Sequence, residues 1–299
     1  MNLSIDDPGT AIASRCRFCG LEPREDEMSK TILITGASSG IGKATAQYFH
    51  DRGWNVVATM RDPQKEKELT ALANVLVTRL DVQDPTSIKS AVDAAIAKFG
   101  KIDVLLNNAG YGAYGPLEAT AMEKIRRQFD VNVMGLLETT KAVLPHFRAN
   151  RSGVIINVSS IGGKMTFPLG TLYHGTKFAV EGLSEALSWE MESIGVRVKI
   201  VEPGAIKTDF GGRSFDFSND ERMVEYQSIV RKLLGIMTNL MTKGSEPMVV
   251  AKVIYEAATD GTNQLRYTAG EDANALVANR KAADDTTFMR RVKEQFGLA

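Results

Sequence analysis

The sequence predicts an α/β protein with a doubly wound parallel sheet, formed as a single domain over residues 30–299. From residue 30 onward, short apolar runs rich in β-branched residues alternate with longer segments of helical periodicity. The runs are almost continuously apolar, which is typical of parallel strands covered by helices on both faces. Several runs end in a polar turn, and ligands bind to such sheets at the carboxyl ends of the strands.

The elements follow in order along the chain. A strand at 31–34 is short and apolar, and the helix after it ends at Gly53. A second helix begins near Pro85 and repeats apolar residues on one face, at Ile88, Val92, Ile96 and Phe99. Longer helices are predicted at 120–147 and 172–192. Further strands are predicted at 54–60, 74–82, 102–110, 153–160, 196–204 and 264–270.

The balance of charges gives no electrostatic case for binding nucleic acid or an anionic membrane. Lysine and arginine together number 36, and aspartate and glutamate also number 36. No apolar run approaches the ~18–20 residues of a membrane span. The first residues also lack the apolar core of a signal peptide. We therefore expect a cytoplasmic protein with no membrane span and no nucleic-acid partner.

The first 29 residues show no periodicity and run into the charged stretch EPREDEMSK, so we expect residues 1–29 to be a disordered tail. The only two cysteines, Cys16 and Cys19, form a lone C-x2-C pair in this tail. A zinc site needs further ligands, and the three histidines are scattered along the chain at positions 50, 146 and 174. We expect no metal.

The stretch LITGASSGIG, residues 33–42, places three glycines where a strand passes into a helix: Gly36, Gly40 and Gly42. The N-terminus of a helix leaves N–H groups unpaired and carries the positive end of the helix dipole, so it attracts phosphate. Glycine also lets an anion approach the bare backbone. Taken alone, these residues fit either a phosphate-binding turn or an ordinary strand–helix turn.

Four motifs in this order, TGASSGIG, NNAG, VSS and YHGTK, resemble those of the short-chain dehydrogenase/reductase family. The resemblance covers about residues 31–270 and implies a Rossmann fold that binds a nicotinamide dinucleotide. The G-x3-G-x-G spacing differs from the G-x-G-x-x-G of other dinucleotide folds. By this resemblance, the cofactor-binding residues are Gly36, Ser38, Ser39, Gly40, Ile41, Gly42, Arg61, Asp81, Val82, Asn108, Ala109, Gly110, Tyr173, Lys177, Pro203, Gly204, Ile206 and Thr208.

The end of the second predicted strand indicates which dinucleotide is bound. Enzymes that use NAD usually place an acid there for the ribose 2′-hydroxyl. This chain has Met60 followed by Arg61, and a guanidinium can bind a 2′-phosphate in a bidentate way. Ser38 in the glycine turn would add a hydroxyl. NADP(H) is therefore preferred over NAD(H), although Arg61 also fits a surface charge near Asp62.

The catalytic residues implied by the resemblance are Tyr173, Lys177, Ser160 and Asn132. Tyr173 and Lys177 are four residues apart and so share one face of a helix. A nearby ammonium stabilises a phenolate, so we expect Lys177 to lower the pKa of Tyr173 from its ordinary value of about 10. Ser160 would orient the substrate, with Ser159 as the more structural alternative.

Two further residues near these motifs need separate interpretation. Asn132 resembles a mid-helix asparagine that the family uses near a proton-relaying water, and a helix kink is the rival explanation. His174 follows Tyr173 directly but points elsewhere on a helix, so we expect no catalytic role for it.

The region at about 205–247 is expected to be a short helical lid over the substrate. It contains Phe210, Phe215 and Phe217, followed by an apolar helical stripe at Val230, Leu233, Leu234, Met237, Leu240 and Met241. Such residues form adaptable apolar walls, although core packing would use the same pattern. The stretches VVATMRDP and KFAVEGL also resemble the hydroxysteroid and retinol dehydrogenase-like subgroup.

The function implied is an NADP(H)-dependent oxidoreductase that interconverts an alcohol and a ketone or aldehyde. An apolar substrate is expected, such as a steroid, a retinoid or a long-chain aldehyde, and the protein is expected to be a homodimer or homotetramer. A catalytically silent NADP(H)-binding regulator on the same fold is the alternative. A sugar-nucleotide epimerase or dehydratase would usually have a different glycine spacing and a larger C-terminal domain.

Overall fold

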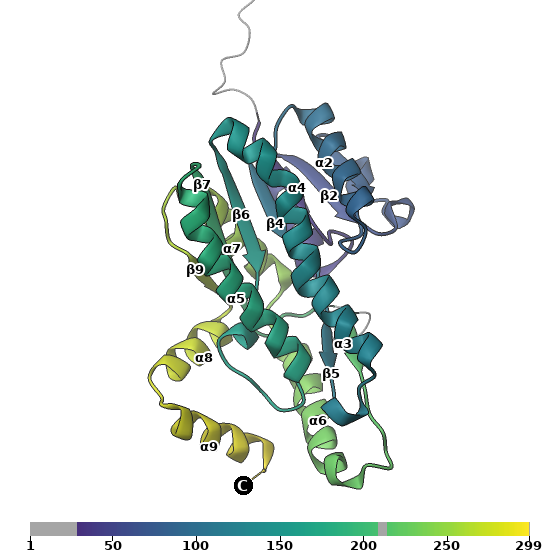
Figure 1. Ribbon diagram of the computed structural model, residues 1–299, viewed down its shortest axis with the longest axis vertical. Coiled ribbons are helices and arrows are strands. Elements are labelled where there is room, and N and C mark those ends of the chain that lie inside the picture. Colours follow the sequence, from purple (N-terminus) through teal and green to yellow (C-terminus); the bar gives the residue numbers. More distant parts are fainter. Residues whose placement is uncertain (1–28, 209–213, 299) are drawn as a thin grey trace, which may run out of the picture.

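The computed structural model describes residues 29–208 and 214–298. Seven parallel strands form one sheet in the order β3-β2-β1-β4-β6-β7-β9 (Figure 1). Their bounds are β1 Thr31–Ile34, β2 Asn55–Met60, β3 Val75–Arg79, β4 Val104–Asn107, β6 Gly153–Val158, β7 Val196–Pro203 and β9 Arg266–Ala269. The predicted doubly wound parallel sheet and Rossmann fold are confirmed. The predicted tail up to residue 28, with both cysteines, and Phe210 lie outside the described residues.

The strand order reverses direction between β1 and β4. From β1 the chain moves outward through β2 to β3, and it then returns to β4 on the other side of β1. Ile32 consequently pairs with Val56 on one side and with Val104 on the other. The connections after β1 and β4 leave in opposite directions at this switch point, which opens a crevice at the carboxyl ends of the strands.

Helices cover both faces of the sheet, and further helices follow the last strand. The helices are α1 Gly40–His50, α2 Pro85–Phe99, α3 Met122–Phe129, α4 Gly135–Asn150, α5 Thr171–Glu192, α6 Gln227–Lys243, α7 Pro247–Thr259, α8 Glu271–Lys281 and α9 Asp285–Phe296. Short 3₁₀ turns lie at Pro63–Lys65, Leu69–Ala71, Leu117–Ala119, Ile161–Gly163 and Val224–Tyr226. None of the described helices is long and apolar enough to cross a membrane.

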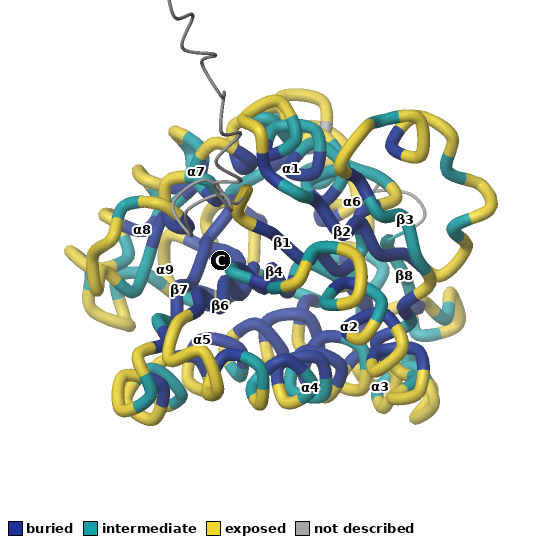
Figure 2. The backbone as a smooth tube through the Cα atoms, turned by 90° about the horizontal axis from the view of Figure 1, so that it is seen from above, coloured by how far each residue is buried: buried dark blue, intermediate teal, exposed yellow. Residues whose placement is uncertain are grey.

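The core forms two layers, because successive side chains of a strand point to opposite faces. Ile32 and Ile34 of β1 pack with residues of α1 and α7, such as Phe49 and Ile254. Leu33 packs on the other face with residues of α2, α4 and α5. Viewed along the sheet, α1 and α7 lie above the strands and α2, α4 and α5 lie below them (Figure 2). Nearly continuous apolar strands are what this two-sided burial requires.

The structure differs from the predicted elements in three regions. The helix predicted at 120–147 is divided into α3 and α4 by a π-helical turn, Asp130–Met134. The predicted lid contains α6 and a short strand, β8 Phe215–Phe217, which pairs in parallel with β5 Gly112–Tyr114. After the last strand, where no helices are predicted from the sequence, α8 and α9 are found.

Candidate active site

The glycine turn between β1 and α1 has a backbone that only glycine adopts without strain. Gly36 and Gly40 have φ values of +70° and +54°, in the left-handed region. A Cβ on Gly42 would lie 2.3 Å from the carbonyl oxygen of Gly36, so α1 could not approach β1 as closely. Asn108, at the end of β4, donates from its amide to the carbonyl oxygens of Thr35 and Gly36 at 2.9 and 3.1 Å. The NNAG turn therefore supports the glycine turn from across the switch point.

A cavity of about 920 Å³ begins at this turn and continues along the carboxyl ends of the strands. All the predicted cofactor-binding residues line it except Gly42. Gly42 lies behind the turn instead. A side chain at this position would collide with Gly36 and Asn108. Ser160, Tyr173 and Lys177 line the same cavity, whereas Asn132 does not. The fold thus brings together segments that are far apart in the sequence.

One end of the cavity is polar. Met60 ends β2 and is buried in the main core, and Arg61 follows at the surface. Arg61 lines the cavity together with Ser38 and with Lys65, which forms an ion pair with Asp62 at 3.0 Å. This end therefore offers a guanidinium and a hydroxyl at its rim.

The opposite end of the cavity holds the catalytic candidates. Tyr173 lies in the first turn of α5, and Lys177 lies one turn later on the same face of the helix. Ser160 follows β6 and accepts a hydrogen bond from the backbone N–H of Gly162 at 3.0 Å. Its side chain also hydrogen-bonds Tyr173. Ser160, rather than the alternative Ser159, is thus the serine joined to the tyrosine.

Burial controls the protonation of the tyrosine and the lysine. Burial raises the pKa of Tyr173 to about 12, and the hydrogen bond with Ser160 opposes this effect. Burial also lowers the pKa of Lys177 to about 8, against the attraction of Glu181. The Nζ of Lys177 lies 5.8 Å from the centre of the Tyr173 ring and donates to the carbonyl oxygen of Val158 at 2.9 Å. The expected lowering of the tyrosine pKa by Lys177 is not what this arrangement produces, because burial dominates.

Asn132 lies in the π-helical turn Asp130–Met134. The helix is therefore irregular at this residue, as the kink explanation expects, and the asparagine is also near the catalytic candidates, as the relay explanation expects. Its amide accepts from the N–H of Tyr111 at 3.1 Å and donates to the carbonyl oxygen of Tyr111 at 2.9 Å. It also donates to the hydroxyl of Thr176 on α5 at 3.1 Å. A Cβ on Gly110 would lie 3.1 Å from Asn132 Oδ1 and 3.9 Å from Lys177 Nζ. Asn132 therefore lies behind the NNAG turn, close to the lysine.

Beyond Tyr173 the cavity becomes apolar. The rings of Tyr114 and Tyr173 lie 5.4 Å apart, and Phe215 lies 5.5 Å from Tyr114 on the other side. Helices α6 and α9 also contribute apolar side chains to this end of the cavity, namely Leu233, Ile236, Met237 and Phe296. The contribution of α9 to this wall was not predicted from the sequence. A signal was present, because Phe288, Val292 and Phe296 recur every four residues.

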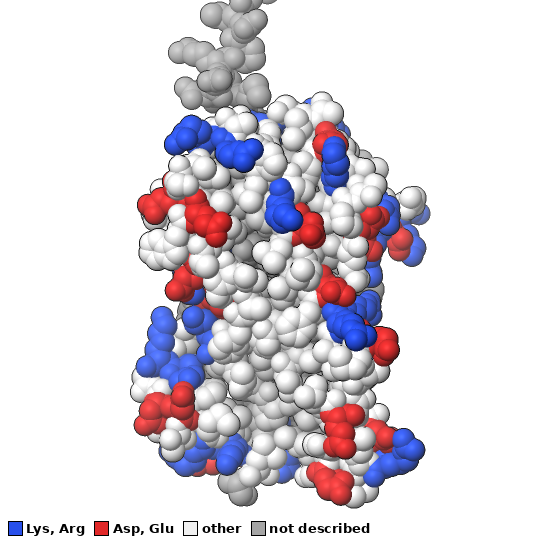
Figure 3. Space-filling view, viewed as in Figure 1, with Lys and Arg blue, Asp and Glu red and all other residues white. Residues whose placement is uncertain are grey.

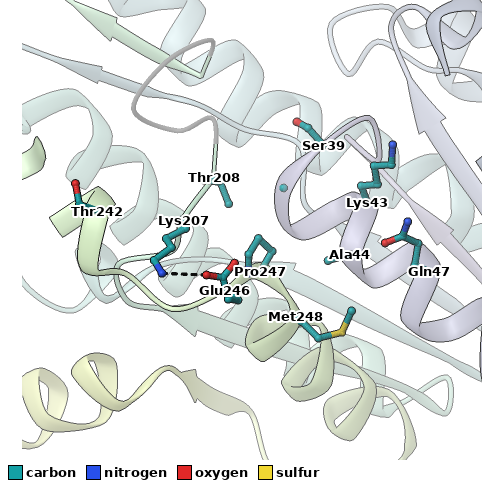
Figure 4. Close-up of a pocket in the computed structure, with 11 residues that line it drawn as sticks. Ser39, Lys43, Ala44, Gln47, Lys207, Thr208, Thr242, Glu246, Pro247 and Met248 are labelled. Atoms are coloured by element: carbon teal, nitrogen blue, oxygen red, sulfur yellow. Dashed lines mark hydrogen bonds and ion pairs between the residues drawn. The ribbon is translucent and has the colours of Figure 1, made fainter. Parts of the chain in front are cut away.

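A second hollow, of about 760 Å³, lies on the outer side of α1 (Figure 4). It shares Ser39, Gly40 and Thr208 with the main cavity. On the side of the hollow that faces α1, Lys207 pairs with Glu246 at 3.0 Å. A Cβ on Gly40 would lie 3.1 Å from the Cγ2 of Thr208, so Thr208 packs closely on the glycine turn. The segment after β7 is thereby joined to the turn between β1 and α1.

Curated relatives resemble this chain over most of their length. An uncharacterized oxidoreductase of Schizosaccharomyces pombe is 50% identical over 80% of this chain and 100% of its own length. A 3-ketodihydrosphingosine reductase of Bacteroides thetaiotaomicron is 36% identical over 84% of this chain and 91% of its own length. Retinol dehydrogenase 8 of Bos taurus is 37% identical over 83% of this chain and 84% of its own length.

Solved structures also resemble this chain over most of their length. A short-chain dehydrogenase from Streptomyces avermitilis superposes with a TM-score of 0.77 at 31% identity, over 91% of this chain and 97% of that one. ElxO with NADP bound superposes with a TM-score of 0.69 at 30% identity, over 83% of this chain and 100% of that one. The family model for the short chain dehydrogenases matches residues 30–218, which hold the glycine turn, the NNAG turn and the Ser160–Tyr173–Lys177 set. This chain is therefore an oxidoreductase of the short-chain dehydrogenase family.

Proposed function

We propose that this protein is an NADP(H)-dependent oxidoreductase that interconverts an alcohol and a ketone or aldehyde on an apolar substrate. The observation that carries the proposal is that Ser160, Tyr173 and Lys177 line the same cavity as the glycine turn. A volume of about 920 Å³ is within the range of ligand sites, which runs to roughly 1,000 Å³.

The residues at the switch point fit a dinucleotide. Gly36 and Gly40 line the cavity and keep the backbone bare at the N-terminus of α1, where phosphate is favoured. Asp81 and Val82 line the cavity beyond it, toward Arg61, and Ile206 and Thr208 line it on the other side. When bound, the nicotinamide gives or receives the hydride. The side chains of this protein would transfer the proton and orient the substrate.

Tyr173 is proposed to move the proton. A phenol whose pKa is raised to about 12 stays protonated at neutral pH, so it can donate to the oxygen that becomes negative as a carbonyl is reduced. Ser160 would hold the same oxygen. Lys177 has three N–H donors, of which Val158 receives one, so the others remain for a ribose hydroxyl and for stabilising a phenolate. Asn132 would keep Gly110 and Tyr111 in place beside this lysine.

The preference for NADP(H) is proposed on the strength of Arg61, supported by Ser38 and Lys65 at the same rim. A 2′-phosphate would gain charge-assisted hydrogen bonds there, and no acid ends β2 to hold a free 2′-hydroxyl. The neighbouring structure of ElxO holds NADP.

The apolar end of the cavity supports a long or polycyclic apolar substrate. Leu233, Ile236, Phe217 and Phe296 all line it, and we propose that α6 together with residues 214–226 acts as the lid. Two relatives are named for 3-ketodihydrosphingosine and for retinol, which both have long apolar chains.

The experiment that tests the proposal is NADPH oxidation measured with steroid ketones, retinal, long-chain aldehydes and 3-ketoacyl thioesters. Turnover of at least one apolar carbonyl, with NADPH favoured over NADH, is the expected result. A protein that binds NADPH yet reduces nothing in the panel would favour the silent regulator instead.

A further inference from the structure

The loop between Ser160 and α5 forms one wall of the cavity. Ile161, Gly162 and Phe167 of this loop line the cavity next to Ser160. His174, in the first turn of α5, lies behind the loop and is only 3% exposed. It is not among the residues that line the cavity. The prediction that His174 takes no direct part in catalysis therefore agrees with its position, but its contacts with the loop are extensive.

Both ring nitrogens of His174 are bonded to the loop. Nδ1 lies 2.9 Å from the carbonyl oxygen of Gly162, and Nε2 accepts from the backbone N–H of Phe167 at 3.0 Å. A carbonyl oxygen can only accept and a backbone N–H can only donate. The ring must therefore be neutral, with its proton on Nδ1. Burial lowers the pKa of His174, which favours this neutral form.

The loop is shaped around the histidine ring. A Cβ on Gly162 would lie 2.9 Å from Nδ1, and a Cβ on Gly170 would lie 2.5 Å from Cδ2. Both positions therefore need glycine for the backbone to pass so close. The rings of Phe167 and Tyr114, which line the apolar end, lie 5.8 and 6.1 Å from the imidazole. One side chain thus joins the backbone beside Ser160 to the aromatic wall of the substrate end.

We propose that His174 is a positioning residue that sets the shape of the substrate end of the cavity. By tying Gly162 to Phe167, it fixes the wall on which a large substrate rests while Ser160 and Tyr173 hold the reacting oxygen. The effect on substrates rests on the proposed function, whereas the effect on the loop does not. A small carbonyl compound would contact Ser160 and Tyr173 but not Phe167 or the apolar wall, so it should depend on the loop less than a large substrate does.

The test compares His174→Phe, which keeps a ring but loses both bonds, with His174→Gln, which keeps one donor and one acceptor. The matched control is His146→Phe. His146 also accepts a backbone N–H, that of Ile102 at 3.1 Å, but it lies on α4 and does not line the cavity. Hydrogen exchange of residues 161–170, NADPH affinity, and kcat and KM for one small and one large carbonyl are measured for each variant.

His174→Phe should speed exchange at 161–170 and lower kcat/KM for the large substrate roughly ten- to hundredfold, mainly through KM. The small substrate and NADPH affinity should change less than about threefold, and His174→Gln should recover part of the loss. If His174→Phe fails to fold, the same loop and KM effects should appear in weaker form in His174→Gln.

Two results would overturn the proposal. One is unchanged exchange at 161–170 in both His174 variants, and the other is faster exchange with no change in the ratio of kcat/KM between the two substrates. A wild-type protein that reduces nothing would count against the proposed function, and the exchange measurement would still decide whether His174 fixes the loop.

Discussion

Tyr173, the proposed proton donor, owes its protonation state to its surroundings. Its ring packs against Tyr114 and its hydroxyl bonds Ser160, while burial holds the proton in place. Phenylalanine would keep the ring and its packing and would lose only the hydroxyl. The substitution Tyr173→Phe therefore tests proton transfer without disturbing cofactor binding.

Tyr173→Phe should lower kcat by about 10²–10⁴-fold, the usual contribution of a general acid. NADPH affinity, measured by fluorescence titration, should stay within about threefold of wild type, because the glycine turn and Arg61 are untouched. Lys177→Met should differ by weakening both turnover and cofactor binding. Wild-type turnover in Tyr173→Phe would contradict the proposed mechanism.

The cofactor preference also depends on one exposed side chain. Arg61→Ala should weaken NADPH binding by roughly ten- to hundredfold, because a charge-assisted contact is worth about 1.5–3 kcal/mol, and should leave NADH binding unchanged. Arg79→Ala is the control, since Arg79 ends the next strand, pairs with Asp84 at 2.9 Å and does not line the cavity. An acid at Met60 would enter the core, so the single substitution is the cleaner test. Equal loss of both dinucleotides would refute the assignment.

Glu202, next to Pro203 at the end of β7, is a buried acid whose protonation should make the stability depend on pH. Burial and the like charge of Glu181 raise its pKa to about 7. Arg266 compensates only partly, because its Nε lies 2.9 Å from Glu181 but 3.6 Å from Glu202. The folded state therefore keeps a proton on Glu202 that the unfolded state releases near its ordinary value of 4.5. The free energy of unfolding must fall as the pH rises from about 4.5 through 7.

Glu202→Gln should remove this loss. The variant should be more stable than wild type by roughly 2–3 kcal/mol at pH 8, and the gain should disappear near pH 4.5. Urea unfolding at both pH values measures the difference. Glu185→Gln, which removes an exposed partner of the same arginine at 2.6 Å, should give no such gain. A pH-independent effect of Glu202→Gln would show that the carboxyl ionises normally.

At the scale of elements, α9 completes the apolar end of the cavity. Phe296 is 3% exposed and packs with Leu233 of α6 and Val292 of its own helix. The two helices come from separate parts of the chain, and their contact closes the cavity beyond Phe167. A change at this contact should therefore alter both the stability of the wall and the fit of a large substrate.

Phe296→Ala should lower the free energy of unfolding by about 3–5 kcal/mol if α9 unfolds with the rest of the domain. It should also raise KM for a large apolar carbonyl more than for a small one, because the wall recedes. Met289→Ala on the same helix is the control, since Met289 is 51% exposed. Thermal melts and steady-state kinetics give the two readouts, and an unchanged KM ratio would exclude α9 from the substrate site.

At the scale of the whole molecule, the outer face of α5 and the turn before α4 expose apolar side chains. Trp189 and Phe178 of α5 are 72% and 45% exposed, and Met134, directly before α4, is 51% exposed. Figure 3 shows a broad uncharged area along the middle of this face, between charged side chains on either side. Exposed apolar patches of this kind mark association sites. We propose that a second copy of the chain covers this face, in a homodimer or as part of a homotetramer.

Replacing Trp189 and Phe178 together by glutamate should reduce the mass in solution, because unpaired charges would be buried at the contact. Light scattering coupled to size exclusion measures the mass. Met289→Glu, at a 51% exposed site on α9, should leave the mass unchanged. A wild-type protein that is already a monomer would refute the proposed association.

The seven strands of the main sheet, helices α1, α2 and α5, the glycine turn and the set of residues at the switch point could all be predicted from the sequence. These features are local: apolar periodicity lies within about ten residues, and the four-residue spacing of Tyr173 and Lys177 already places them on one face. Parallel pairing then brings the turns after the strands to one edge. For this reason the predicted cofactor residues line one cavity, with Gly42 as the exception, as do three of the four catalytic candidates.

The burial, the hydrogen bonds and the pKa values of those residues depend on the tertiary structure. Burial raises the pKa of Tyr173 and lowers that of Lys177, in place of the shift expected from their pairing. The π-helical turn at Asn132, the bonds of His174 to its loop and the wall formed by α9 likewise depend on contacts between distant segments. Desolvation and packing are set by every group that surrounds a side chain in space, and spacing along the chain does not report which groups those are.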